Sequence, residues 1–190
     1  MVGMAHCRPL LLSLSLPLLL AGCRRPATQV YVAPGVPFRL CPPEAGPELS
    51  VNQEVVFQLP DGRRETALAA IENHGGVLNL VASSPLGQTL VVIRVKGLDA
   101  AVDARIPIPG DLDPKVLAAL VEFALWPEAA LRASLGPGVR LEQDGDKRTL
   151  LRKDKVVWTV TREGTAPPFR RLVLENPAMG LTVRVRTLGD

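Results

Sequence analysis

The sequence predicts a mainly β protein with two central helices (α+β), built as a curved antiparallel sheet or an unclosed β-barrel whose helices cover the concave face. Three observations lead to this fold class. Apolar and polar residues alternate along most of the chain, which is typical of half-buried strands. Turn sequences such as Pro60-Asp61-Gly62 separate the alternating stretches. Two apolar helical stretches interrupt the strands in the middle of the chain, and strands resume after them.

The first strands are expected to form consecutive antiparallel hairpins. The alternating stretches are 51–59, 64–72, 77–83, 88–96 and 101–106. One face of 88–96 carries only β-branched residues, whereas the other begins with Leu90 and Val92 and ends with Arg94 and Lys96. We expect this strand to pass from a covered interior to a rim, with Leu90 and Val92 in the covered part.

Proline marks the start of both helices. Asp113 precedes Pro114, so an N-cap carboxylate is followed by proline at the first helical position of a helix that runs to 126. The charged residues of this helix, Lys115 and Glu122, point in nearly the same direction, so we expect the helix to be buried on several sides. A shorter helix is expected at 127–135, before a Gly-Pro-Gly stop.

Five further strands are expected after the helices. They are 139–143, 149–153, 155–162, 169–175 and 181–187, with Asp144-Gly145-Asp146 as the first turn. In the last strand apolar residues alternate strictly with Thr182, Arg184 and Arg186, so one side faces a core and the other faces water.

The amino-terminal residues predict secretion. Arg8 is followed by an apolar run of about 11 residues, which would span roughly 16 Å as a helix, against about 30 Å for a bilayer core. Residues 1–22 are therefore expected to be a signal peptide rather than a membrane span. The sequence Leu20-Ala21-Gly22-Cys23 resembles the lipobox of bacterial lipoproteins, which implies that Cys23 is lipidated and anchors the chain in a membrane. By the same resemblance, Arg24 favours the periplasmic face of the outer membrane.

Residues 23–47 are expected to form the lipidated cysteine and a proline-rich tether. This segment contains six prolines, which favour an extended chain, although Val30 and Val32 alternate with Tyr31 and leave open a short strand at 29–33. Residues 48–190 then form a single half-barrel domain, which we expect to be a monomer.

Composition limits the function classes. The formal net charge is +3 and no dense Lys/Arg run is present, so we expect no nucleic-acid partner. Of the three cysteines, Cys7 leaves with the signal and Cys23 takes lipid, so Cys41 has no internal disulfide partner. A small structural residue is the favoured interpretation of Cys41 over a functional thiol.

No pattern for catalysis, metal or cofactor binding is visible. After the signal, His74 is the single histidine, and it lies in a Gly-Gly turn rather than beside a serine in a Gly-x-Ser-x-Gly elbow. Asp144 and Asp146 are explained by a solvated turn. We therefore expect the protein not to be an enzyme and to bind neither a cofactor nor a metal. Trp126 and Trp158 either line a cavity or fill a core, and other cavity walls would be aliphatic, which suits acyl chains.

Three sequence signatures occur in the right order and spacing for a known family. Ser84-Pro85-Leu86-Gly87-Gln88 is followed by Asp113-Pro114 and then by Leu125-Trp126-Pro127. Over roughly 50–190 the chain resembles a family of uncharacterised bacterial lipoproteins with a domain of unknown function, whose genes often lie beside aryl-polyene or fatty-acid-like biosynthesis genes.

More distantly, the chain resembles the outer-membrane receptor of the Lol lipoprotein-sorting pathway, which also has Pro-Leu-Gly before a strand and then a helix. The helix end at Leu135-Gly136-Pro137 fits that receptor only in part, and its tryptophan-bearing second helix is replaced by Arg132, Ala133 and Ser134. The resemblance implies an unclosed β-barrel that holds a hydrophobic cavity under helices.

Two functions from different classes follow. In the first, the protein is an outer-membrane lipoprotein that binds or accepts an apolar ligand, such as a lipid, acyl chain, polyene or acylated protein. Its expected partner besides the membrane is this apolar ligand or a periplasmic carrier protein. The expected lining residues are Leu90, Val92, Leu117, Leu120 and Trp126. In the second, the interior is filled and the lipoprotein is structural or binds partners, with Arg170, Arg171, Arg184 and Arg186 as a contact surface. A hydrolase using His74 is the third and least favoured alternative.

Overall fold

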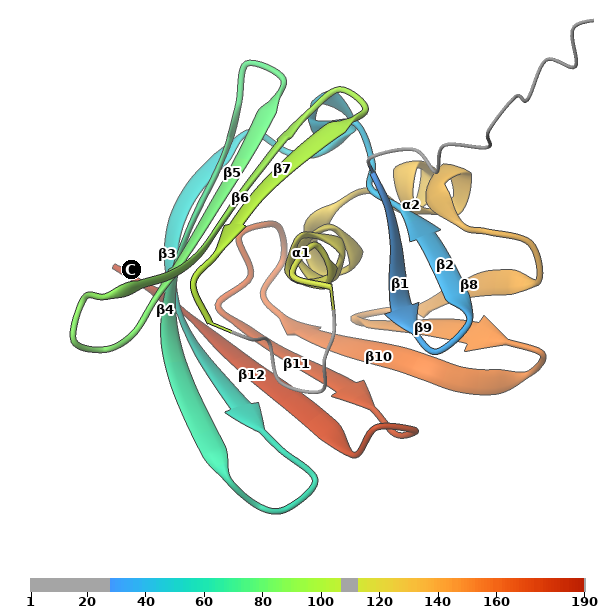
Figure 1. Ribbon diagram of the computed structural model, residues 1–190. Helices are drawn as coiled ribbons and strands as arrows, with labels where there is room; N and C mark the ends of the chain where they lie inside the picture. Colours follow the sequence, from blue (N-terminus) through green and yellow to red (C-terminus); the bar gives the residue numbers. More distant parts are fainter. Residues whose placement is uncertain (1–27, 107–112, 190) are drawn as a thin grey trace, which may run out of the picture.

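The computed structural model describes residues 28–106 and 113–189, which form one curved antiparallel sheet of ten strands, a two-stranded hairpin and two helices (Figure 1). The elements, in chain order, are β1 (Gln29–Ala33), β2 (Val36–Arg39), a 3-10 turn (Pro43–Ala45), β3 (Leu49–Gln58), β4 (Arg64–His74), β5 (Val77–Ser83), β6 (Thr89–Lys96), β7 (Asp99–Ala104), α1 (Val116–Leu125), α2 (Glu128–Ser134), β8 (Val139–Asp144), β9 (Lys147–Arg152), β10 (Lys155–Glu163), β11 (Arg171–Asn176) and β12 (Leu181–Leu188).

The large sheet is an unclosed barrel. Its strand order is β7-β6-β5-β4-β3-β12-β11-β10-β9-β8, so β3 pairs with β12 in the middle, and β7 and β8 end the described sheet without pairing with each other. Helix α1 lies inside the curve, and the β1–β2 hairpin lies beside it (Figure 1). The predicted fold class is confirmed.

Alternation explains why the core lies on the concave face. In β4 the inward residues Ala67, Ala69 and Ile71 are buried, and the residues between them are exposed. The same period of two runs through β12, where Leu181, Val183 and Val185 are buried. The strands from β3 to β6 and from β8 to β12 therefore contribute apolar faces to a single core shared with α1 and the hairpin, whereas β7 is mostly exposed.

The prediction of a tether over 23–47 is wrong for the described residues from Thr28 onward. Val30, Val32, Phe38 and Leu40 are at most 3% exposed and belong to the core. The prolines do not prevent this, because a proline without an N–H is tolerated at turns, at strand edges and in the first turn of a helix. The domain therefore begins by Thr28 rather than at 48, and residues 23–27 lie outside the described residues.

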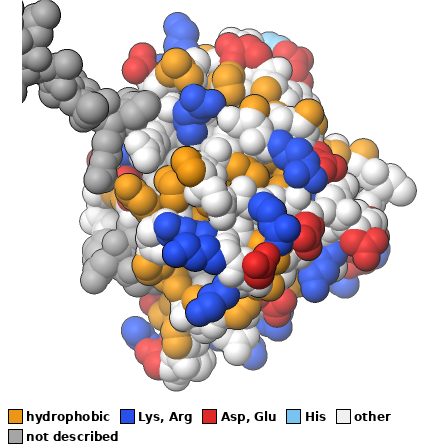
Figure 2. Space-filling view, turned by 90° about the vertical axis from the view of Figure 1, so that its right-hand side faces the viewer, with side chains coloured by type: hydrophobic (Ala, Val, Ile, Leu, Met, Phe, Trp, Pro, Cys, Tyr) orange, Lys and Arg blue, Asp and Glu red, His pale blue; other side chains and the backbone are white. Residues whose placement is uncertain are grey.

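The surface shows no large area of one charge on the face drawn in Figure 2. Lys and Arg side chains alternate there with Asp and Glu, and scattered apolar side chains lie between them (Figure 2). Within the described part of the chain, no helix has the length and apolar character needed to cross a membrane.

Candidate functional site

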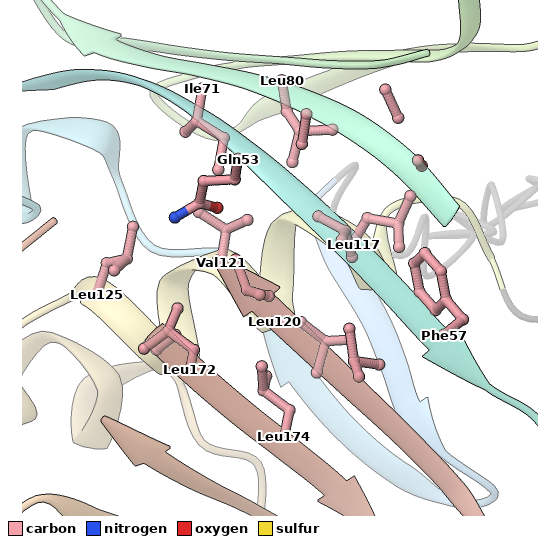
Figure 3. A pocket seen from close by; sticks show the side chains of 17 residues that line it. Gln53, Phe57, Ile71, Leu80, Leu117, Leu120, Val121, Leu125, Leu172 and Leu174 are labelled. Atoms are coloured by element: carbon pink, nitrogen blue, oxygen red, sulfur yellow. The ribbon is translucent and has the colours of Figure 1, made fainter. Parts of the chain in front are cut away.

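An apolar cavity lies between helix α1 and the curved wall of β3, β4, β5, β11 and β12 (Figure 3). Its volume is about 80 Å³, and it is partly open to the outside. Of the 17 described residues that line it, only Gln53 is polar. Helix α1 contributes Leu117, Leu120, Val121, Ala124 and Leu125.

Helix α1 has one side packed against protein and one side facing the cavity. It packs closely on β1 and β10. Most of its residues are fully buried, as predicted, but Leu117 and Val121 are only half-buried and line the cavity. An apolar surface is therefore left on α1 that no side chain of the wall completely covers.

Small residues create the space opposite the helix. Ala67 and Ala69 of β4, Ala82 of β5 and Ala124 of α1 all line the cavity. Alanine keeps a face apolar but extends no further than Cβ, so the backbone of β4 and the helix stay apart without side chains to fill the gap. Interiors are normally close-packed, so this gap is a specific feature of the site.

The volume of the cavity limits what fits in the structure as it stands. An engineered apolar cavity of about 150 Å³ in another protein stays dry and binds benzene. The cavity here is smaller, at about 80 Å³. A long acyl chain would therefore enter only if α1 moved away from the wall.

Two hydrogen bonds hold α1, and a third joins the strands beside it. The indole Nε1 of Trp158 donates to the carbonyl oxygen of Val32 at 2.7 Å, which joins β10 to β1 beside the helix. The backbone N–H of Cys41 donates to Oε2 of Glu122 at 2.8 Å. Arg148 Nη1 donates to the carbonyl oxygen of Phe123 at 2.9 Å, near the carboxyl end of the helix. The amino-terminal segment thus fixes α1 at Glu122, and β9 fixes its carboxyl end.

Glu122 is an ionisable residue inside the core. It is completely buried, and its Oε1 has no hydrogen-bond partner among the described residues. Burial raises the pKa of its carboxyl from 4.5 to about 8, and the N–H of Cys41 opposes this shift only in part. Glu122 is therefore mainly neutral at pH 7. The sequence pattern placed Glu122 and Lys115 on one face of the helix. It did not reveal that Glu122 on this face packs against the amino-terminal segment at Cys41.

Cys41 is a protonated core thiol. Its Sγ lies 3.1 Å from Oγ of Ser134, and burial raises the pKa of the thiol to about 12. Thiolate is the reactive form of cysteine, so this environment favours a structural residue over a nucleophile.

Two of the five predicted lining residues line the cavity. Leu117 and Leu120 do so from α1. Leu90 and Val92 do not, because β6 turns Val91, Ile93 and Val95 inward, and Val92 shares the outer face with Arg94. Trp126 is completely buried against Gly46 and fills the core behind the helix. Cys23, the predicted lipidation site, lies outside the described residues.

The residues considered for chemistry lie apart from the cavity. His74 is exposed at the end of β4, with Nδ1 3.5 Å from Glu48. Asp144 and Asp146 lie at the β8–β9 turn. Within residues 28–106 and 113–189, no three His, Cys, Asp or Glu side chains are grouped as metal ligands. The surface arginines pair with their neighbours, Arg186 with Glu54 at 3.0 Å and both Arg170 and Arg171 with Glu163.

Comparison with known proteins gives a family and a structural neighbour. The family model described as "Protein of unknown function (DUF3261)" matches residues 50–189, which run from β3 to the end of β12 and leave out the β1–β2 hairpin. No curated protein matches the chain significantly. Among solved structures, a LolA superfamily protein from Nitrosomonas europaea is 14% identical, with a TM-score of 0.42, over 77% of this chain and 88% of that one.

Proposed function

Because the chain belongs to the DUF3261 family, whose function is unknown, we propose its role from the geometry of the cavity: it binds a long apolar ligand, such as an acyl chain, between the wall and α1, and α1 moves away from the wall to admit it. The observation that carries this proposal is an alanine-lined gap opposite the half-buried Leu117 and Val121. Burial of an acyl chain there would contribute about 0.8 kcal/mol per methylene group. The proposal assigns the chain no catalytic step.

We place this binding at the cell envelope, on the sequence features of residues 1–27. In this proposal Cys23 is lipidated and holds the domain at the periplasmic face of the outer membrane, where it exchanges its ligand with a periplasmic carrier protein. Since the domain begins by Thr28, only residues 24–27 separate it from the anchor Cys23, and the chain from Cys23 to Thr28 spans at most about 18 Å. The cavity would therefore stay close to the membrane surface.

The small volume of the cavity favours one alternative, a lipoprotein with a filled interior that serves as a structural or partner-binding component. In this alternative the gap of about 80 Å³ is a packing defect that binds nothing. The two functions differ in whether apolar molecules bind, and in whether filling the gap changes that binding.

Binding of the neutral fluorophore N-phenyl-1-naphthylamine separates them. The chain from Arg24 onward contains the whole described core and is suitable for the measurement. Ala69→Leu fills the cavity from β4, and Ala70→Leu is the matched control, because Ala70 is the adjacent residue and points outward. We expect the wild-type chain and Ala70→Leu to bind the fluorophore, and lauryl alcohol to displace it. We expect Ala69→Leu to weaken binding at least about tenfold, or about 1.4 kcal/mol.

Two results would overturn the proposal. One is a wild-type chain that binds neither the fluorophore nor lauryl alcohol. The other is equal binding by Ala69→Leu and Ala70→Leu when both variants unfold at the same urea concentration as the wild type.

A further inference from the structure

Two arginines without an acidic partner lie on the concave face of the sheet. Arg148 and Arg162 are 4% and 7% exposed. Within the described part of the chain, neither has a carboxylate within 4.0 Å. Glu128 acts on Arg148, and Asp146 on Arg162, only through weaker, longer-range attraction. Buried charges are usually paired, so two buried arginines without a carboxylate partner are unusual.

Strand register places Arg162 beside the cavity and Arg148 beside Arg162. Arg162 of β10 lies directly opposite Leu172 of β11, and Leu172 lines the cavity. Arg148 of β9 lies opposite Val160 of β10. Val160 and Arg162 are two positions apart on one face, so Arg148 and Arg162 are diagonal neighbours, about 7–8 Å apart at the backbone.

Uncharged groups hold both guanidinium groups in place. Arg148 donates from Nε to Oε1 of Gln143 at 2.9 Å, and from Nη1 to carbonyl oxygens of Phe123 and Ala124 at 2.9 and 3.4 Å. Ala124 also lines the cavity.

Arg162 is held in a similar way at the β8–β9 turn. It donates from Nη2 to the carbonyl oxygen of Gly145 at 3.2 Å and packs 5.0 Å from the ring centre of Phe169. Both cations are thereby oriented by groups that do not neutralise them.

One terminal nitrogen of each guanidinium remains available. Within residues 28–106 and 113–189, Nη2 of Arg148 and Nη1 of Arg162 make no hydrogen bond. Both atoms keep some contact with solvent. The pair is also held at an electrostatic cost, because burial and the charge of Arg162 lower the pKa of Arg148 to about 10. An anion close to both nitrogens would offset this repulsion.

We propose that Arg148 and Arg162 bind the anionic head group, a carboxylate or a phosphate, of an amphiphile whose apolar chain occupies the cavity beside Leu172. This inference rests on the proposed function and adds the ligand class to it. Guanidinium groups suit this chemistry, because their N–H donors form charge-assisted hydrogen bonds with carboxylate and phosphate oxygens. The alanine-lined gap would hold the tail, and the arginine pair would set its orientation.

Competition with N-phenyl-1-naphthylamine tests the head group separately from the tail. Laurate, lauryl phosphate and lauryl alcohol share one alkyl chain and differ in charge. We expect laurate or lauryl phosphate to displace the fluorophore at roughly tenfold lower concentration than lauryl alcohol, which corresponds to one charge-assisted contact. Which of the two anions binds better identifies a carboxylate or a phosphate as the preferred head group.

Substitutions test whether the preference for an anionic head group comes from the arginine pair. Arg162→Gln should remove most of the advantage of the anion and leave lauryl alcohol unchanged, and Arg162→Lys should keep part of it. Arg94→Gln, on the outer face of β6, is the matched control and should change nothing. Equal displacement by all three compounds in the wild type, or an anion preference that survives Arg162→Gln, would overturn the head-group site. Binding of lauryl alcohol would still leave the proposed function standing, whereas failure of every compound would overturn both.

Discussion

Replacement of Glu122 by glutamine should make the protein less sensitive to pH. The carboxyl is completely buried, and burial raises its pKa from 4.5 to about 8. Above pH 4.5 the unfolded chain loses this proton while the folded chain keeps it up to about pH 8. The contribution of Glu122 to the free energy of unfolding is therefore largest below pH 4.5 and falls between the two values.

The size of the effect follows from the same interval. Each pH unit between the two pKa values costs the folded state about 1.4 kcal/mol, so the full loss approaches about 5 kcal/mol. Glutamine has no proton to lose, and its amide oxygen can still accept the hydrogen bond from the N–H of Cys41. The advantage of Glu122→Gln over the wild type should therefore grow as pH rises and become constant above about pH 8.

Urea unfolding of both chains at several pH values from 4.5 to 8 measures this difference. Glu142→Gln is a suitable control, because the Glu142 side chain is 61% exposed on β8, and it should show no comparable pH-dependent gain. A difference between Glu122→Gln and the wild type that stays constant across the interval would refute the reasoning.

Three other experiments test the packing around α1. Trp158→Phe removes the 2.7 Å hydrogen bond to Val32 and should lower the free energy of unfolding in urea by about 1–3 kcal/mol, so an unchanged value would contradict its role. Cys41, completely buried with a pKa of about 12, should resist iodoacetamide until the chain unfolds, and rapid labelling of the native chain would show that the segment after β2 opens away from α1. Gly46→Ala places a Cβ against the indole of Trp126 and should lower the melting temperature through overpacking worth about 1–3 kcal/mol, whereas an unaltered temperature would mean that the indole moves freely.

Periodicity made most of the fold predictable from the sequence. The helices and the strands of the large sheet begin and end within two residues of their expected bounds. Alternation and turn residues act locally, which explains this success. The β1–β2 hairpin was not predicted as part of the domain, because its prolines favoured an extended tether over the alternation noted at Val30 and Val32, which long-range packing on α1 makes stable.

The cavity was only partly predictable. Leu117 and Leu120 could be found because α1 is apolar in nearly every direction. Ala67 and Ala69 could not be predicted as lining residues from the sequence. Alanine is common in any element, and it leaves a gap only where the element packed opposite does not fill the space. On β6 the face that carries only β-branched residues was the better indicator of the interior. The face of Leu90 and Val92 also carries Arg94 and Lys96, and these charged side chains keep that face outside.

The inward orientation of Arg148 and Arg162 could be predicted from the local sequence. Arg148 shares its strand face with the buried Leu150, and Arg162 shares its face with Trp158 and Val160, so alternation alone turns both inward. Only the strand register shows that they come together, with Arg162 beside the cavity.

Photolabelling with an acyl chain that carries a diazirine, followed by peptide mass spectrometry, tests the central claim most directly. Binding between α1 and the wall predicts labels on the peptides that contain Leu117, Val121 and Ala69, lost in Ala69→Leu and retained in Ala70→Leu. Labels spread over exposed residues such as Leu86 and Leu98, unaffected by Ala69→Leu, would contradict a ligand cavity in this fold.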